Sequence, residues 1–257
     1  MEGFSETLLK GKTALVIGGT SGIGKSIVET FSSCGANVVV VGRSETNYSN
    51  ISFGAGSSNS FAQIDLQKSS VSKYFKKHPE ALPTNKFDLI IASAGTEFIR
   101  PFHASSQSDF HESSKTTLEV AIDIACNLSK KKYLNDFSSI VFISSTSISS
   151  GIPGMGIYSA SRSGISSISK VLASELYTRN IRVNTVLAGA TQTPMHDKIL
   201  SRLSKSSVQK YLSSHPLGFG EPQDVANMVV LLSSHLGKWI TGSSLSVDGG
   251  YSGIRVS

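Results

Sequence analysis

Continuous apolar runs rich in β-branched residues recur along this chain. Six of them are clear, at 13–19, 37–42, 87–95, 139–145, 181–189 and 244–250. Because the runs are continuous rather than alternating, they are typical of parallel strands covered by helices on both faces of a sheet. A seventh, weaker strand is expected near 60–65.

Segments with helical periodicity lie between these runs. Ile23, Ile27 and Phe31 recur at intervals of four residues, and 158–177 and 221–235 also have helical patterns. Alternation of strands and helices predicts an α/β fold of the doubly wound, Rossmann type, with a seven-stranded parallel sheet. We expect a single domain over residues 1–257.

Two regions depart from this alternation. Residues 44–60 are so rich in Gly, Ser and Asn that one helix is expected to be short or absent. Residues 194–220 form a long polar insertion. We interpret 190–215 as a mobile lid over the substrate.

Composition narrows the class of protein. The 257 residues, 39% of them hydrophobic, suffice for one substantial core. No apolar run approaches the roughly 18 residues of a membrane span, and the N-terminus lacks the apolar segment of a signal peptide. We therefore expect a cytoplasmic protein with no membrane partner.

Charge and cysteine spacing argue against two kinds of binding partner. The formal net charge is +6, but the basic residues are spread out, and the run Lys130–Lys132 is predicted to lie late in a helix. The chain has no Cys-x-x-Cys spacing and no clustered histidines. We expect neither a nucleic-acid partner nor a metal.

A glycine-rich loop, Gly18-x-x-x-Gly22-x-Gly24, follows the first strand and opens the first helix. Glycine permits turn conformations closed to other residues and lets backbone amides approach a phosphate without a Cβ in the way. The spacing differs from the common Gly-x-Gly-x-x-Gly fingerprint. The loop nevertheless indicates a dinucleotide-binding site.

Further motifs accompany this loop in order along the whole chain. They are Asp65 after the third strand, "ASAG" at 92–95, Ser145 thirteen residues before Tyr158, Asn184, Thr193, and "ITGSSLSVDGG" at 240–250. Together with the glycine loop, they resemble the short-chain dehydrogenase/reductase family. The resemblance implies an enzyme that uses a nicotinamide cofactor to reduce a small molecule.

The resemblance also implies the cofactor contacts. The glycine loop would hold the pyrophosphate and ribose, residues after the third and fourth strands would contact the adenine side, and residues after the sixth strand would hold the nicotinamide. The full set is Gly18, Thr20, Ser21, Gly22, Ile23, Gly24, Asp65, Leu66, Ala94, Gly95, Gly189, Thr191 and Thr193, with Tyr158 and Arg162 beside the nicotinamide ribose. For Asp65, capping of the strand end is an alternative role.

The end of the second strand indicates which cofactor is preferred. A carboxylate there would bind the adenosine ribose and repel a 2′-phosphate. This chain has Arg43 and Ser44 instead, and arginine suits phosphate by its charge and planar fork. We predict NADPH/NADP+, with Arg43 and Ser44 on the 2′-phosphate; an ordinary solvated arginine is the alternative.

The catalytic positions are partly altered. In the family, a serine binds the carbonyl oxygen, a tyrosine protonates it, and a lysine and an asparagine complete the group. Ser145 and Tyr158 match the first two. Arg162, four residues after Tyr158 and so on the same helix face, replaces the lysine, and Thr117 replaces the asparagine.

These replacements preserve charge but alter the proton relay. A unit charge about 4 Å from a phenolate is worth roughly 4 kcal/mol at an effective dielectric near 20, so Arg162 can still stabilise a tyrosinate by its charge. Arginine does not readily lose a proton, however, and its fork is larger than an ammonium. Thr117 can bond a carbonyl one turn back, but it has no amide.

Three functions remain open. The first is NADPH-dependent reduction of a carbonyl or imine group, with Tyr158 as proton donor. The second is a specialised enzyme of secondary metabolism that reduces an iminium ion or performs a non-redox step. The third is a cofactor-binding protein with little turnover.

The partner is expected to be a free small molecule. "ITGSSLSVDGGYS" at 240–252 looks like the acyl-carrier-protein reductases, which use a pair of arginines, but Asp136 stands opposite Arg179 in that pair and would repel an acidic carrier. Basic residues of the lid hint at an anionic substrate, although solvated surface charges are the alternative; they are His196, Lys198, Arg202, Lys205, Lys210 and His215. Ile152 and Met155 are expected to shape the substrate pocket. The resemblance implies a homodimer or homotetramer through helices near 110–133 and 158–178.

Overall fold

Seven parallel strands form one sheet at the centre of the protein, in the order β3-β2-β1-β4-β5-β6-β7. The computed structural model describes residues 4–202 and 204–254. The strands are β1 (Thr13–Ile17), β2 (Asn37–Gly42), β3 (Asn59–Gln63), β4 (Phe87–Ala92), β5 (Leu134–Ser145), β6 (Arg182–Ala188) and β7 (Ser244–Val247). The predicted fold class is therefore confirmed, including the weak third strand.

The continuous apolar runs form buried strands because both faces of the sheet are covered. Leu15 of β1 pairs in register with Val39 of β2 and Ile90 of β4, and all three belong to one core cluster. The next residue, Val16, belongs to the cluster on the opposite face. Successive side chains of a strand point to opposite faces, so a strand buried on both faces is apolar throughout.

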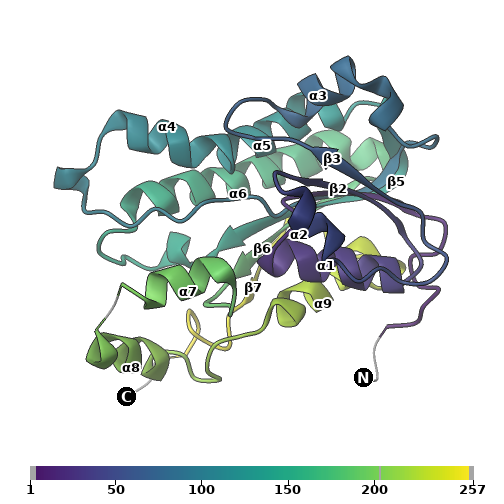
Figure 1. Ribbon diagram of the computed structural model, residues 1–257. Helices are drawn as coiled ribbons and strands as arrows, with labels where there is room; N and C mark the ends of the chain where they lie inside the picture. Colours follow the sequence, from purple (N-terminus) through teal and green to yellow (C-terminus); the bar gives the residue numbers. More distant parts are fainter. Residues whose placement is uncertain (1–3, 203, 255–257) are drawn as a thin grey trace.

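Helices cover the two faces of the sheet (Figure 1). One face carries α3 (Val71–Lys77), α4 (Gln107–Lys115), α5 (Leu118–Asp123) and α6 (Gly156–Leu176), and the other carries α1 (Gly22–Ser33) and α9 (Pro222–Ser233). α2 (Glu45–Ser49) has five residues, which confirms the expected short helix. Short helical turns occur at Pro79–Ala81, Phe102–Ala104, Ile124–Leu128, Thr146–Ser149, Tyr177–Arg179 and His235–Gly237.

The polar insertion contains two helices that its composition did not reveal. They are α7 (Pro194–Leu200), capped by Thr193, and α8 (Lys205–Ser213), capped by Ser204. Both lie to one side of the sheet, at the end where the strands terminate (Figure 1). A serine or threonine cap and a proline in the first turn stabilise such short polar helices. That this segment moves as a lid remains a proposal.

Some predicted boundaries differ from the observed ones. β5 begins at Leu134, five residues before the apolar run, because Leu134 pairs with Phe87 before a break in register. Phe137, with φ of 60°, lies within that irregularity. Lys130–Lys132 follows a helical turn that ends at Leu128, rather than lying inside a helix. Within the described ranges, no helix is long and apolar enough to cross a membrane.

Candidate active site

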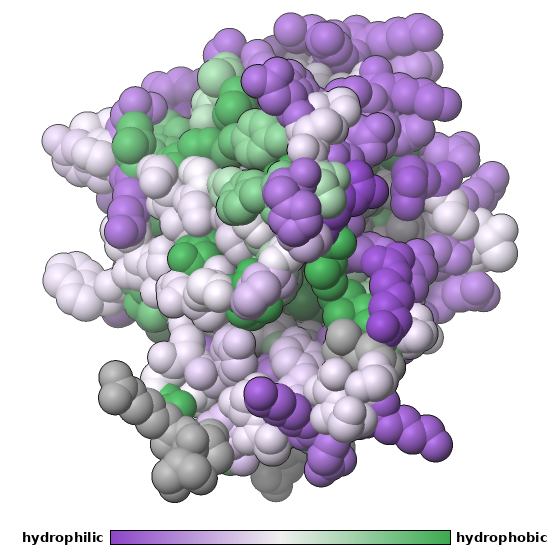
Figure 2. All heavy atoms as spheres, turned by 90° about the vertical axis from the view of Figure 1, so that its left-hand side faces the viewer, coloured by the Kyte–Doolittle hydropathy of each residue, from purple (hydrophilic) through white to green (hydrophobic). Residues whose placement is uncertain are grey.

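A cleft opens at the carboxyl ends of the central strands. Gly18 follows β1, Ala94 follows β4, Ser145 ends β5 and Gly189 follows β6, and all four line it. Figure 2 shows the face that carries α4, α7 and α8, which is hollowed at its centre, with apolar side chains near the hollow and hydrophilic ones further out. Ligands of doubly wound folds bind at this edge of the sheet.

The glycine loop fits tightly against the end of β4. Gly18 has φ of 82° and Gly22 has φ of 51°, conformations that favour glycine. A Cβ on Gly18 would lie 2.6 Å from the Cα of Ala94, and a Cβ on Gly24 would overlap the carbonyl oxygen of Gly18. Ser21 is the N-cap of the 12-residue helix α1, and its hydroxyl makes no capping hydrogen bond in the described chain. The amides at this helix start are therefore available to a phosphate.

The segment after β6 meets the glycine loop from the other side of the cleft. Thr191 is buried and its hydroxyl donates to the carbonyl oxygen of Gly189 (3.1 Å). The hydroxyl oxygen of Thr193 accepts from the amide of His196 (3.2 Å). A Cβ on Gly22 would lie 3.1 Å from the Cγ2 of Thr193. Residues about 170 positions apart in the sequence thus form one narrow passage.

Most of the expected cofactor residues line this cleft or the smaller cavity beside it. The cleft includes Gly18, Ser21, Gly22, Ile23, Gly24, Ala94, Gly95, Tyr158, Arg162, Gly189, Thr191 and Thr193. The smaller cavity, at the ends of β2 and β3, adds Thr20, Arg43 and Leu66. Glycines and amides for a pyrophosphate, a cavity on the β2 side and threonines at the far end together suit an extended dinucleotide.

Two expected cofactor residues lie outside both cavities and serve as local caps. Ser44 caps α2 by accepting from the amide of Asn47 (3.1 Å). Asp65 accepts from the amide of Gln67 (3.0 Å) and pairs with Lys68 (3.8 Å). Asp65 thus takes the capping role weighed as its alternative, and contact of either residue with a cofactor stays a prediction.

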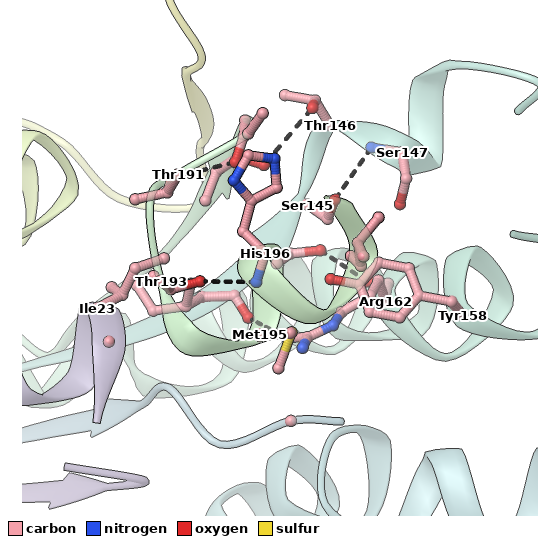
Figure 3. Close-up of a pocket in the computed structure, with 18 of the residues that line it drawn as sticks. Ile23, Ser145, Thr146, Ser147, Tyr158, Arg162, Thr191, Thr193, Met195 and His196 are labelled. Atoms are coloured by element: carbon pink, nitrogen blue, oxygen red, sulfur yellow. Dashed lines mark hydrogen bonds between the residues drawn. The ribbon is translucent and has the colours of Figure 1, made fainter. Parts of the chain in front are cut away.

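Ser145 and Tyr158 face the same cleft (Figure 3). The Oγ of Ser145 accepts from the amide of Ser147 (3.2 Å), so its own proton remains free to be donated. Tyr158 lies in the first turn of α6 and is half-buried. Its hydroxyl makes no hydrogen bond within the described residues, which leaves both its donor and acceptor positions for a ligand.

The side chain of Arg162 lies inside the site, next to Tyr158. The side chain is buried, Nη1 donates to the carbonyl oxygen of Ile143 (2.9 Å), and Cζ lies 5.0 Å from the centroid of the Tyr158 ring. A Cβ on Gly95 would overlap Nη2 and reach within 2.9 Å of Cζ. Gly95 therefore provides the room that the larger guanidinium needs beside the tyrosine.

Thr117 lies outside the cleft lining, at a break between α4 and α5, with φ of −125° and ψ of −84°. Its buried hydroxyl donates to the carbonyl oxygen of Ser113 (2.7 Å), the bond to the preceding turn expected from the sequence. Because this bond uses the hydroxyl proton, Thr117 stabilises the break rather than donating into the cleft.

Several lining residues were missed or misread from the sequence. Tyr211 of α8 and Tyr251 after β7 line the cleft, but no local pattern marks them. His196 and His215 were read as possible basic surface groups, whereas both are buried. Ile152 and Met155 do line the cleft. Only the packing of α7, α8 and the C-terminal segment brings these residues together.

The doubly wound sheet, the glycine loop at a helix start and the serine–tyrosine pair define the class of nicotinamide-dependent oxidoreductases. Comparisons agree. The family model described as Enoyl-(Acyl carrier protein) reductase matches residues 18–252. The chain belongs to the short-chain dehydrogenase/reductase family.

Individual relatives cover nearly the whole chain. A 3-oxoacyl-[acyl-carrier-protein] reductase of Aquifex aeolicus is 33% identical over 95% of this chain and 99% of the relative. A tropinone reductase homolog of Arabidopsis thaliana is 29% identical over 95% and 93%. The solved structure of a short-chain dehydrogenase/reductase from Serratia marcescens, 23% identical, has a TM-score of 0.85 and covers 95% of this chain and 99% of its own. At this sequence identity, the likeness to the Serratia marcescens structure shows the shared fold alone.

Proposed function

We propose that the protein is an NADPH-dependent reductase that converts a carbonyl or imine group of a free small molecule, with Tyr158 as the proton donor. One observation carries the proposal: the buried guanidinium of Arg162 lies against the ring of Tyr158, which faces the same cleft as Ser145. The altered position 162 thus still supplies a cation to the tyrosine.

The chain's residues suit this reaction. When bound, the cofactor supplies a hydride to the carbonyl carbon. Ser145 donates a hydrogen bond to the carbonyl oxygen, and Tyr158 gives that oxygen its proton, so the product is an alcohol. The positive charge of Arg162 stabilises the tyrosinate that remains. Water at the open side of the cleft would return the proton to Tyr158, because the guanidinium of Arg162 does not readily release a proton and the hydroxyl of Thr117 donates to Ser113.

Preference for NADPH is supported by the cavity at the end of β2. Arg43 is exposed there and forms no ion pair among the described residues. No carboxylate occurs among the residues found to line that cavity. A free guanidinium without a neighbouring carboxylate favours a 2′-phosphate.

A free substrate is favoured over one carried by a protein. The Aquifex aeolicus relative is named for action on an acyl-carrier-protein substrate. In this chain Arg179 pairs with Asp136 (2.7 Å) and donates to the carbonyl oxygens of Ser129 (2.6 Å) and Leu134 (2.7 Å). Its charge and donors are used inside the molecule, so it has little to offer an acidic carrier.

A second candidate is reduction of an iminium ion in secondary metabolism. Such a substrate needs a hydride but no proton from the enzyme, and Arg162 and Thr117 both lie in the altered proton-relay half of the site. The two candidates differ in their dependence on the Tyr158 hydroxyl.

The test is NADPH oxidation against a panel of ketones, aldehydes and imines. We expect Tyr158→Phe to lower kcat for ketones by about 10²–10⁴-fold, far more than it raises the Kd for NADPH. Tyr177→Phe, at an exposed tyrosine, is the matched control and should behave like the parent. Imine reduction that survives Tyr158→Phe supports the second candidate. Tight NADPH binding without any turnover contradicts both and indicates a cofactor-binding protein.

A further inference from the structure

Five ring-bearing side chains pack together at the active-site cleft, and four of them line it. We call them the ring cluster: His196 of α7, Tyr211 of α8, and His215, Phe219 and Tyr251 in the segments that follow. The rings of His196 and Phe219 meet edge to face at 4.7 Å, and those of His215 and Tyr251 stack at 4.5 Å. All members except Phe219 line the cleft that contains Ser145 and Tyr158.

His196 is the member of the ring cluster whose hydrogen-bonding atoms are both buried and unpaired within the described residues. Its side chain is 5% exposed, and neither ring nitrogen has a partner within residues 4–202 and 204–254. His215, by contrast, has Nδ1 2.8 Å from the carbonyl oxygen of Tyr211. A buried polar group left unpaired costs about 1–3 kcal/mol. Figure 3 shows the imidazole projecting from α7 toward Thr146 and Thr191, within the cleft.

The imidazole of His196 is uncharged in this setting. Burial, and to a smaller extent the neighbouring His215, lower its pKa below the ordinary value, against the opposing effect of Asp197. A neutral imidazole presents one donor and one acceptor, which suits a hydroxyl or a carbonyl group. It does not attract an anion.

The charges of the lid do not change this conclusion. Lys198, Arg202, Lys205 and Lys210 are exposed, and none of them is among the residues found to line the cleft. Arg162 is the one lysine or arginine in that described lining, and Ile143 already accepts from it. The cleft therefore offers an anionic substituent no free cation beyond the catalytic position.

Apolar side chains also line the cleft. Ile152, Met155, Met195 and Ile199 line the cleft together with the ring cluster. Flat rings stack favourably on aromatic side chains, and methionine adapts to their edges. The surface therefore suits a flat, ring-bearing molecule.

We propose that His196 is a substrate-binding residue, and that the substrate is an uncharged, ring-bearing ketone or imine with a hydroxyl or carbonyl substituent that bonds to its imidazole. This inference rests on the proposed reductase function, because Ser145 and Tyr158 define the end of the cleft where the reacting group lies. The inference identifies His196 as the residue that binds the other end of the substrate, away from the reacting group.

Binding of tetralone and its ring-hydroxylated isomers to the protein–NADP+ complex tests the inference by calorimetry. We expect at least one hydroxytetralone to bind the parent about tenfold or more tightly than tetralone, as one added hydrogen bond of about 1.4 kcal/mol allows. His196→Phe should remove this preference, and His196→Gln, which keeps a donor and an acceptor, should retain part of it. Lys198→Ala, on the exposed face of the same helix, is the matched control and should retain all of it.

The inference is overturned if the parent prefers no isomer, or if a preference survives His196→Phe. A carboxytetralone that binds more tightly than every hydroxytetralone also overturns it. An unchanged Kd for NADP+ and a cooperative thermal unfolding transition show that the variants remain folded and that the nicotinamide site is intact. Because calorimetry needs no turnover, failure of this inference and failure of the proposed reductase activity are separate outcomes.

Discussion

At the scale of single residues, Arg162 and Gly95 form a matched pair. The guanidinium occupies the space in which a Cβ on residue 95 would stand, while Ile143 accepts its hydrogen bond. The site therefore has room for the guanidinium and one acceptor for it, while Nε has no partner within the described residues.

This pairing predicts a non-additive effect on catalysis. Gly95→Ala should displace the guanidinium and lower kcat by about tenfold or more. In an Arg162→Lys background the same substitution should lower kcat less, because an ammonium needs less room. The two single variants and the double variant are compared by steady-state kinetics. Gly253→Ala, where a Cβ has open space, is the control. Equal costs of Gly95→Ala in both backgrounds would show that the two residues are independent.

His196 predicts how stability depends on pH. Its pKa in the folded protein is lowered, chiefly by burial, from the ordinary value of 6.5. The unfolded chain therefore binds a proton first as the pH falls, so stability is lost below about pH 6.5. Of the groups packed around the ring, Asp197 opposes this shift and His215 adds to it, while Tyr211, whose pKa is raised to about 12, stays neutral.

Thermal unfolding between about pH 7 and pH 5 checks this prediction. The Tm of the parent should fall more steeply over this range than the Tm of His196→Phe, which has no imidazole to protonate at this position. Parallel curves for the two proteins would show that His196 does not contribute.

At the scale of elements, the proposed preference for NADPH depends on the turn from β2 into α2. α2 has only five residues and is capped by Ser44, and Arg43 stands exposed beside the smaller cavity. A cation in this place would interact with the one phosphate that distinguishes the two nicotinamide dinucleotides.

Arg43→Ala should therefore raise KM for NADPH by about tenfold and leave KM for NADH unchanged, because only the former has a 2′-phosphate. The effect should weaken with added salt. Lys170→Ala, an exposed cation of α6, serves as control. An Arg43→Ala variant that keeps its NADPH affinity would make Arg43 an ordinary surface arginine.

At the scale of the whole molecule, exposed apolar side chains indicate how copies associate. Ile122 of α5 is 45% exposed and Val171 of α6 is 57% exposed, on the helices expected to pair. Trp239, 95% exposed, precedes the edge strand β7. Exposed apolar side chains of this size are common at protein–protein contacts.

We expect light scattering to give a mass of two or four times 27.2 kDa. Val171→Asp should reduce this mass, because a carboxylate at a helix contact would be desolvated without a partner. Lys210→Asp, on the exposed side of α8, should have no effect. A parent protein that remains monomeric at all concentrations contradicts the prediction.

The sequence alone determined the sheet, the glycine loop and the Ser145–Tyr158 pair. The sheet and the loop depend on local patterns: continuous apolar runs for strands buried on both faces, and glycines at fixed spacing for a tight turn. Such patterns act within a few residues, so they can be read without knowing the fold. The Ser145–Tyr158 pair follows from the resemblance to the family, whose motifs lie in order along the chain.

Only the tertiary structure decided how the altered and unmarked residues are used. Gly95 makes room for Arg162, and Asp65 and Ser44 serve as caps. The ring cluster joins α7, α8 and the segment after β7 around His196. These roles depend on contacts between side chains far apart in the chain, which local patterns do not encode. The character of the substrate wall therefore emerged only when these segments were packed together.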